Sequence, residues 1–297
     1  MNQLDHDEIV QRVRFELWRD NVAGALELLD MPSRHDPDPA LAAEASEIRS
    51  WLRHLDSRAA YASAYEDYYR QVKRFTGFRR LELTVRTWSG QKTRKMVART
   101  ARHPEFLRLE RELHAAEATR VLDAGCGEGR VALTLGARHP HTLVDGVEVS
   151  ATNVGIARGL NRFPNVTFHH GLIEELDRWS SPGAFDLAYA FAVLEHVRDV
   201  DEVVETVLRA LRPGGRFCFV VPMSEFAVTG PLPAFRPKDG VAGHVRVFTE
   251  ASLRERFGGE KDFVLEKIPA LRWRRGIYPS TLRPTEFGSF FVAFGKA

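Results

Sequence analysis

The sequence predicts an α/β fold, in which a seven-stranded, mostly parallel sheet carries helices on both faces and follows a helical N-terminal region. Two observations support this prediction. After residue 118, short apolar runs of strand length alternate with stretches of helical periodicity, a pattern typical of right-handed crossovers between parallel strands. Residues 1–60 instead hold apolar residues at roughly helical spacing. Because the composition changes near residue 115, we expect a helical region over 1–115 and an α/β domain over 116–297.

The N-terminal region contains three expected helices and a reversal of charge. Apolar residues recur at helical spacing over 9–17 and 22–29, prolines interrupt the pattern, and a further helix is expected over 41–55. Residues 1–60 hold 12 acids and 7 arginines, a local net charge of −5. Residues 70–112 hold 13 bases and 4 acids, a local net charge of +9. The two segments therefore carry opposite charge.

The basic segment 70–112 has three interpretations. The favoured one is a solvated helical surface that pairs with the acidic first segment. The second is a basic wall beside the active site, which attracts a substrate that bears phosphate or carboxylate. Nucleic-acid binding is the weakest interpretation, because only Phe75, Phe78 and Trp88 stand among the bases as stacking platforms. The net charge of the whole chain is only +2, which favours neither nucleic acid nor an anionic membrane as a partner.

The elements of the α/β domain are expected in alternating order. The first five strands are predicted at 119–124, 142–149, 166–169, 185–191 and 216–221, with helices at 129–138, 151–161 and 200–211. A helix at 250–257 precedes two further strands at 263–268 and 290–294. These last two strands are expected to form an antiparallel edge, which brings the strand count to seven.

The composition favours a soluble protein of the reducing cytoplasm. Apolar residues make up 44% of the chain, which excludes disorder as its main state. The two cysteines, Cys126 and Cys218, are too few for a disulfide framework, and the acidic first residues differ from a signal peptide. No apolar run approaches the roughly 20 residues that cross a bilayer, so no membrane contact is expected.

The most informative segment is the glycine-rich turn at 121–130, VLDAGCGEGR. Gly125, Gly127 and Gly129 occupy alternate positions between a strand and a helix. Missing Cβ atoms let a ligand approach the backbone, and the helix N-terminus offers N–H groups to an anionic group. Asp123 lies two residues before the first glycine, where a carboxylate attracts a cation. The spacing differs from the dinucleotide fingerprint, and the ligand is expected to carry both signs of charge.

A second acid is expected to hold a sugar. Glu148 ends the second predicted strand, 19 residues after Gly129, which is close to the offset of about 20 at which an acid accepts hydrogen bonds from ribose hydroxyls. Asp145 lies nearer the middle of this strand, and we favour an ordinary polar role for it. A zwitterionic amino-acid end at the first loop and a ribose at the second describe S-adenosylmethionine.

Five motifs in order, VLDAGCGEGR, GVEVS, FDLAYAFAVLEHV, LRPGGRFCFVVP and GHVRVFTEASL, resemble the class I methyltransferases over about residues 118–295. They are most similar to the group that contains ubiquinone-type and natural-product small-molecule methyltransferases. The resemblance implies a Rossmann-like sheet and S-adenosylmethionine as cofactor. It implies a methionine site at Asp123, Gly125 and Gly127, a ribose site at Glu148, an adenine face at Val149 and a sulfonium region near Phe191.

The adenine site departs from the family pattern. Leu172 stands where the family usually has an aspartate that accepts from the adenine amino group. Backbone groups of Leu172 and Ile173 can still reach the adenine, and Glu174 is a substitute acceptor. We therefore expect backbone groups of Leu172 and Ile173, rather than an aspartate side chain, to contact the adenine.

Methyl transfer is an in-line displacement that depends mainly on alignment, so a general base is optional. For a hydroxyl acceptor, the candidates for that base are His196 in VLEHV and His244 in GHVRVF. The alternative for His196 is a helix-start residue that fixes the loop. Glu195, His196 and His244 also resemble part of the metal site of methyltransferases that modify small RNAs, but the upstream glutamate falls near Ala192. No metal site is therefore predicted.

The predicted function is transfer of a methyl group from S-adenosylmethionine to an oxygen or nitrogen atom of a small-molecule acceptor. An acceptor that carries an anionic group is one option. The segment 222–247 and the N-terminal helices are expected to form a lid, with Tyr65, Tyr68 and Tyr69 as contacts on one helical face. Two alternatives stay open: an RNA or protein methyltransferase that uses segment 70–112, and a catalytically degenerate binding module. The oligomeric state also stays open, with a homodimer among the options.

Overall fold

The computed structural model describes residues 22–31, 57–72, 90–223, 248–269 and 288–296, together with positions 9, 12, 13, 16, 39 and 46. Several predictions fall largely or wholly outside this part of the chain. They are the helices over 9–17 and 41–55, the segment 222–247 as a lid, His244 as a general base, and Phe75, Phe78 and Trp88 as stacking platforms.

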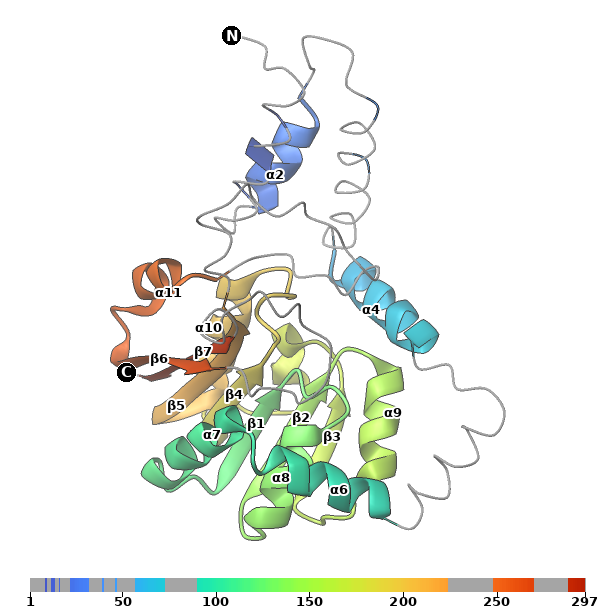
Figure 1. Cartoon of the computed structure of the whole chain (residues 1–297), viewed down its shortest axis with the longest axis vertical. Coiled ribbons are helices and arrows are strands. Elements are labelled where there is room, and N and C mark those ends of the chain that lie inside the picture. Colours follow the sequence, from blue (N-terminus) through green and yellow to red (C-terminus); the bar gives the residue numbers. More distant parts are fainter. Residues whose placement is uncertain are drawn as a thin grey trace.

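Seven strands form one sheet, in the order β3-β2-β1-β4-β5-β7-β6 (Figure 1). Pairing is parallel from β3 to β5, and β7 is antiparallel to both β5 and β6. The strands are β1 (Arg120–Ala124), β2 (Leu143–Glu148), β3 (Val166–His170), β4 (Phe185–Phe191), β5 (Leu211–Pro222), β6 (Lys261–Pro269) and β7 (Gly288–Gly295). The predicted seven-stranded, mostly parallel sheet is confirmed, and its antiparallel part consists of the last two strands.

The start of β5 differs from the prediction. The sequence predicts this strand over 216–221, where the run RFCFVV is apolar. In the structure, pairing with β4 begins at Leu211 and then shifts register before it resumes at Arg216. Backbone hydrogen bonds to Lys296 hold the intervening glycines, since Gly214 donates to its carbonyl at 3.3 Å and Gly215 accepts from its amide at 2.8 Å.

Helices cover both faces of the sheet (Figure 1). One apolar core cluster joins the sheet to α10 (Val200–Ala210), α11 (Glu250–Phe257) and the 3-10 helix η2 (Ile173–Arg178). The other joins it to α7 (Pro104–Ala115), α8 (Arg130–Arg138) and α9 (Ala151–Leu160). The alternation is clear on β5, where Phe217 and Phe219 belong to the first cluster and Cys218 and Val220 to the second.

Earlier in the described part of the chain lie α2 (Val22–Leu29), α4 (Arg58–Val72) and α6 (Gln91–Thr100). Helix α6 packs against α8, and its Thr93 donates to the carbonyl of Leu160 at the end of α9, at 2.7 Å. Helices α6 and α7 belong to the predicted region 1–115, yet both lie against the α/β domain. The boundary at residue 115 stays a prediction. Among the described residues, no helix has the length and apolar character that a membrane span requires.

Helix α4 (Arg58–Val72) lies over the edge of the sheet beside α9 (Figure 1). Its sequence, RAAYASAYEDYYRQV, places tyrosines at positions 61, 65 and 69, which are four residues apart and share one helical face. Tyr61 and Tyr65 are buried, and their rings lie 4.7 Å apart. These tyrosines lie toward the carboxyl ends of the strands, where they line a cavity.

Candidate functional site

A cavity of about 340 Å³ opens at the carboxyl ends of β1, β2 and β4. Parallel sheets bind ligands at this edge, and the volume lies in the range of small-molecule sites. The structure brings nine predicted site residues together in its lining: Asp123, Gly125, Gly127, Glu148, Val149, Leu172, Ile173, Phe191 and His196. Of the predicted lid tyrosines, Tyr65 and Tyr69 line the cavity. Tyr68 is outside the lining and packs edge-on against Tyr69.

The glycine-rich turn has a backbone that other residues would strain. Gly125 has φ +81°, and a Cβ atom there would lie 2.5 Å from Cγ2 of Val193 in the loop after β4. Gly127 also has a positive φ, of +53°, but open space lies where its Cβ would be. Gly125 therefore allows the turn to pack closely against Val193, whereas Gly127 leaves the backbone accessible to a ligand.

Glu148 is held by backbone amides at the end of β2. Its two carboxylate oxygens accept from Gly127 N–H and Ser150 N–H, each at 3.0 Å. Burial raises the pKa of Glu148, although these hydrogen bonds and one from Asn153 oppose the shift. The carboxylate thus joins the glycine-rich turn to the start of α9 and has a fixed position in the cavity wall.

Asp123 is the most deeply buried acid of the lining. The residue is 3% exposed. Within the described residues Oδ2 accepts no hydrogen bond of ordinary geometry, although the buried Tyr189 hydroxyl lies near enough to lower the pKa of the carboxyl. Burial raises the pKa of Asp123 to about 7, and the nearby charge of Glu148 acts in the same direction. A buried carboxylate oxygen without a partner favours a cationic group of a ligand at this position.

The loop after β4 forms the opposite wall. Ala192 has φ +54°, a conformation that costs free energy for a residue with a side chain and often marks functional sites. His196 follows in a turn, with Nε2 3.9 Å from Oε1 of the buried Glu195 and its ring edge-on to Tyr65, 6.2 Å between centroids. The alternative for His196 was a helix-start residue that fixes the loop. Helix α10 begins four residues later, where Asp199 caps it, and the role of His196 in the loop stays a prediction. The His196 side chain lines the cavity.

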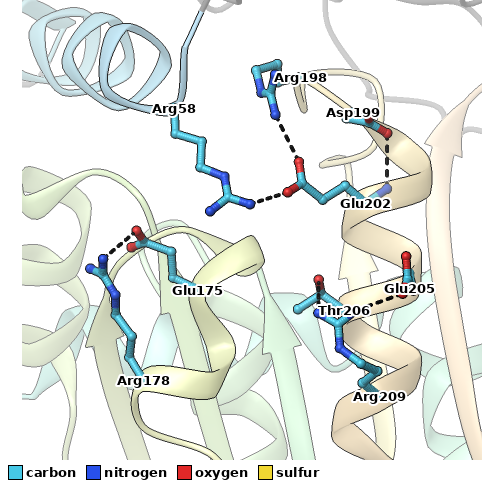
Figure 2. Close-up of polar contacts among 9 residues, drawn as sticks. All are labelled: Arg58, Glu175, Arg178, Arg198, Asp199, Glu202, Glu205, Thr206 and Arg209. Atoms are coloured by element: carbon cyan, nitrogen blue, oxygen red, sulfur yellow. Dashed lines mark hydrogen bonds and ion pairs between the residues drawn. The ribbon is translucent and has the colours of Figure 1, made fainter.

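Helix α4 is attached on both sides of the cavity. Glu66 accepts from Ser150 Oγ at 2.9 Å, and from the backbone and hydroxyl of Thr152 at 3.0 and 2.7 Å. At the other end of the helix, Arg58 pairs with Glu202 of α10, which also accepts from Arg198 at 3.0 Å (Figure 2). The tyrosine face is thereby held against the cavity.

Acids dominate the charge of the described lining. Asp123, Glu128, Glu148 and Glu174 line it, and Arg130 is the one Lys or Arg among its residues. The Arg130 side chain is 66% exposed. The described bases of segment 70–112 lie outside the lining, and Arg108 pairs with Glu112 and Glu266 at 2.6 and 2.8 Å. In the described part of the chain, these bases therefore form no wall of the cavity, and their pairing with residues 1–60 stays a prediction.

Among the contributors to the site that the sequence predictions missed are Tyr61, Glu66 and Asn153. Tyr61 extends the tyrosine face by one turn, and its spacing of four from Tyr65 is a signal that was present in the sequence. Glu66 and Asn153 had no such signal. The partner of Glu66 comes from a distant segment, since Ser150 is 84 residues away, whereas Asn153 bonds to the neighbouring Ser150 and Glu148.

Comparisons with known proteins indicate the family of this chain. A family model described as a methyltransferase domain matches residues 89–267. The chain is 36% identical over 103 residues to a ubiquinone biosynthesis O-methyltransferase of Aromatoleum aromaticum, a match covering 34% of this chain and 42% of the relative. It is 34% identical over 107 residues to a trans-aconitate 2-methyltransferase of Variovorax paradoxus, covering 36% and 39%.

The chain thus spans less than half the length of these two curated relatives in the matched regions. Among solved structures, the YcgJ protein of Bacillus subtilis matches with 21% identity and a TM-score of 0.49, covering 65% of this chain and 99% of that chain.

Proposed function

This chain belongs to the methyltransferase-domain family, and from that premise we propose that it transfers a methyl group from S-adenosylmethionine to an oxygen or nitrogen atom of a small-molecule acceptor. The observation that carries the proposal is the meeting of Asp123 and Glu148 in one cavity. They end neighbouring parallel strands, and the glycine-rich turn lies between them. A ligand with a cationic amino-acid end and a ribose suits this arrangement.

The residues present fit S-adenosylmethionine in two respects. Asp123 Oδ2 is buried without a partner among the described residues, which suits the ammonium group of the amino-acid end. The open space beside Gly127 lets a ligand lie against the backbone. In this proposal the cofactor-binding residues are Asp123, Gly125 and Gly127 for the methionine part, Glu148 for the ribose, Val149, Leu172 and Ile173 for the adenine, and Phe191 near the sulfonium.

When bound, S-adenosylmethionine supplies an electrophilic methyl group on its sulfonium. The protein's own task is then to hold an acceptor atom in line with that group and to exclude water. His196 is the proposed general base, because its side chain lines the cavity and can take a proton from an acceptor hydroxyl or amine. His244 remains a second candidate outside the described residues.

Helix α4 is proposed to recognise the acceptor. The support is that Tyr61, Tyr65 and Tyr69 line the same cavity as Asp123 and His196. Both similar proteins are named for small-molecule acceptors, and trans-aconitate is a carboxylate anion. An anionic acceptor would need cations beyond Arg130, such as bases of the segments outside the described residues. The homodimer also stays a proposal.

Replacing Glu148 with alanine tests the ribose assignment. We expect the affinity for S-adenosylhomocysteine, the demethylated product, to fall by about 10- to 100-fold, because charge-assisted hydrogen bonds are each worth about 1.5–3 kcal/mol. Isothermal titration calorimetry measures the dissociation constant. Glu128→Ala is the matched control, since Glu128 lines the cavity but is not assigned to the sugar. Equal losses in both variants would contradict the assignment.

The raised pKa of Asp123 predicts that cofactor binding depends on pH. Because the pKa is about 7 without a ligand, and binding of an ammonium favours the ionised form, we expect affinity for S-adenosylhomocysteine to rise roughly eightfold from pH 6 to pH 7.5. For folding of the ligand-free protein, the effect of pH has the opposite sign. The contribution of Asp123 to the free energy of unfolding is present at acidic pH and is lost as the pH rises through about 7.

The variant Asp123→Asn checks this prediction. It should bind more weakly and with an affinity that changes less than twofold over the same pH interval, as measured by calorimetry. An unmodified protein whose affinity is constant from pH 6 to pH 7.5 would contradict the role of Asp123 in binding a cation.

A further inference from the structure

Glu66 connects α4 to the start of α9, which follows Glu148 in the cavity wall. Its carboxylate accepts three hydrogen bonds from the first turn of α9, two from Thr152 and one from Ser150. The backbone N–H of Thr152 lies in the first turn of the helix, where amides have no partner within the helix. Glu66 therefore caps α9 from a helix that is remote in the sequence.

Ser150 links Glu66 to Glu148. Its hydroxyl donates to Glu66 and accepts from Asn153 N–H at 3.2 Å, while its backbone N–H donates to Glu148 at 3.0 Å. Ser150 is completely buried, so it has little freedom to move independently of these partners. The position of the Glu148 carboxylate thus depends on a residue that Glu66 holds.

The charge of Glu66 suits this link. Burial acts to raise its pKa, but the hydrogen bonds from Thr152 and Ser150 outweigh burial, and the pKa of Glu66 is lowered. The positive end of the α9 dipole stabilises the same charge. Glu66 is therefore ionised at neutral pH and accepts at both oxygens.

The same residue holds the tyrosine face. Glu66 directly follows Tyr65, whose ring lies edge-on to His196, and it is three residues from Tyr69 in the cavity lining. The second attachment of α4, Arg58 to Glu202 (Figure 2), is more exposed, and neither of its two residues lines the cavity. The attachment through Glu66 therefore connects to the Glu148 carboxylate, whereas the attachment through Arg58 does not.

We propose that Glu66 is a positioning residue for methyl transfer: it orients Glu148 through Ser150 and holds the tyrosine face of α4 over the acceptor. The inference rests on the proposed function. Supporting residues of this kind fix the geometry of the groups that touch a ligand. Docking of α4 and binding at Glu148 then favour each other, because both depend on the same placement of Ser150.

The test measures the affinity for S-adenosylhomocysteine by calorimetry in the full chain. We expect Glu66→Gln to weaken binding about three- to tenfold, and Ser150→Ala, which breaks the link but keeps Glu66, to weaken it similarly. Arg58→Gln is the matched control, because it removes a charge from the same helix without affecting Ser150. It should change the affinity less than twofold.

A double-mutant cycle separates positioning from simple attachment of the helix. In a Glu148→Gln background, Glu66→Gln should change the affinity less than twofold, because the residue through which it acts has already been altered. An equal effect in both backgrounds, or an equal loss in Arg58→Gln, would overturn the inference. Should Glu66→Gln fold poorly, Ser150→Ala replaces it in the same cycle with the same criterion.

The result also distinguishes the two proposals. If the unmodified protein does not bind S-adenosylhomocysteine, the proposed function fails and this inference falls with it. If the unmodified protein binds and Glu66→Gln binds equally well, only the role of Glu66 is wrong.

Discussion

Replacing His196 with glutamine is expected to lower kcat by about 100- to 10,000-fold and to leave the affinity for S-adenosylhomocysteine within about twofold. This is the typical contribution of a general base. Glutamine keeps a hydrogen-bonding side chain of similar length but cannot take the proton. The measurement is steady-state kinetics with an accepted substrate, found by screening small hydroxyl and amine compounds with radiolabelled methyl donor.

The control for this variant is His170→Gln. His170 is exposed, and its Nε2 lies 3.1 Å from the carbonyl of Val149, so it is close to the cavity without lining it. We expect its kcat to stay within about twofold of the unmodified protein. A His196→Gln enzyme that keeps normal kcat would show that His196 supports the loop rather than transfers a proton, and would leave His244 as the candidate base.

Gly125→Ala is expected to lower the free energy of unfolding by about 2–4 kcal/mol and to reduce cofactor affinity at least tenfold. The backbone conformation alone costs a residue with a side chain about 1–2 kcal/mol. The new Cβ would also lie 2.5 Å from Cγ2 and 2.9 Å from Cγ1 of Val193. Since Val193 lines the cavity and follows Ala192, its displacement changes the wall on which the ligand rests.

Two further variants separate the backbone strain at position 125 from the close contact with Val193. Gly125→Ala combined with Val193→Ala removes the close contact but keeps the backbone strain, so it should recover part of the stability. Gly155→Ala is the control in α9, where nothing lies within 4 Å of the new Cβ, and it should stabilise the helix by about 0.5–1 kcal/mol. Chemical denaturation measures all three. A normal affinity in Gly125→Ala would show that the turn does not contact the ligand.

The side of the cavity that holds Asp123 and Glu148 was predictable because its residues belong to local patterns. Asp123 and Glu148 each stand at the end of an apolar strand, and parallel strands end at a common edge of the sheet. Their placement around the glycine-rich turn follows from strand order alone. The strand boundaries were also close to the prediction, since glycines and prolines bound most of them.

Other features depend on long-range contacts and had no local signal. The first part of β5 looks like a turn because of Pro213 and Gly214, and only its pairing with Phe185 and the backbone of Lys296 makes it part of the sheet. Glu66 looks like one half of an ordinary pair with Arg70, four residues away. Its contacts with α9 are set by how α4 docks, which helical periodicity does not determine.

The order of the strands has a consequence for synthesis of the chain. Strands β5 and β6 both pair with β7 and not with each other, although β6 is made first. Until the ribosome has delivered residues 288–295, the edge of β5 has unpaired backbone groups next to Phe217 and Phe219. Nascent chains therefore pass through a stage with an open, apolar sheet edge, which is the kind of intermediate that chaperones bind.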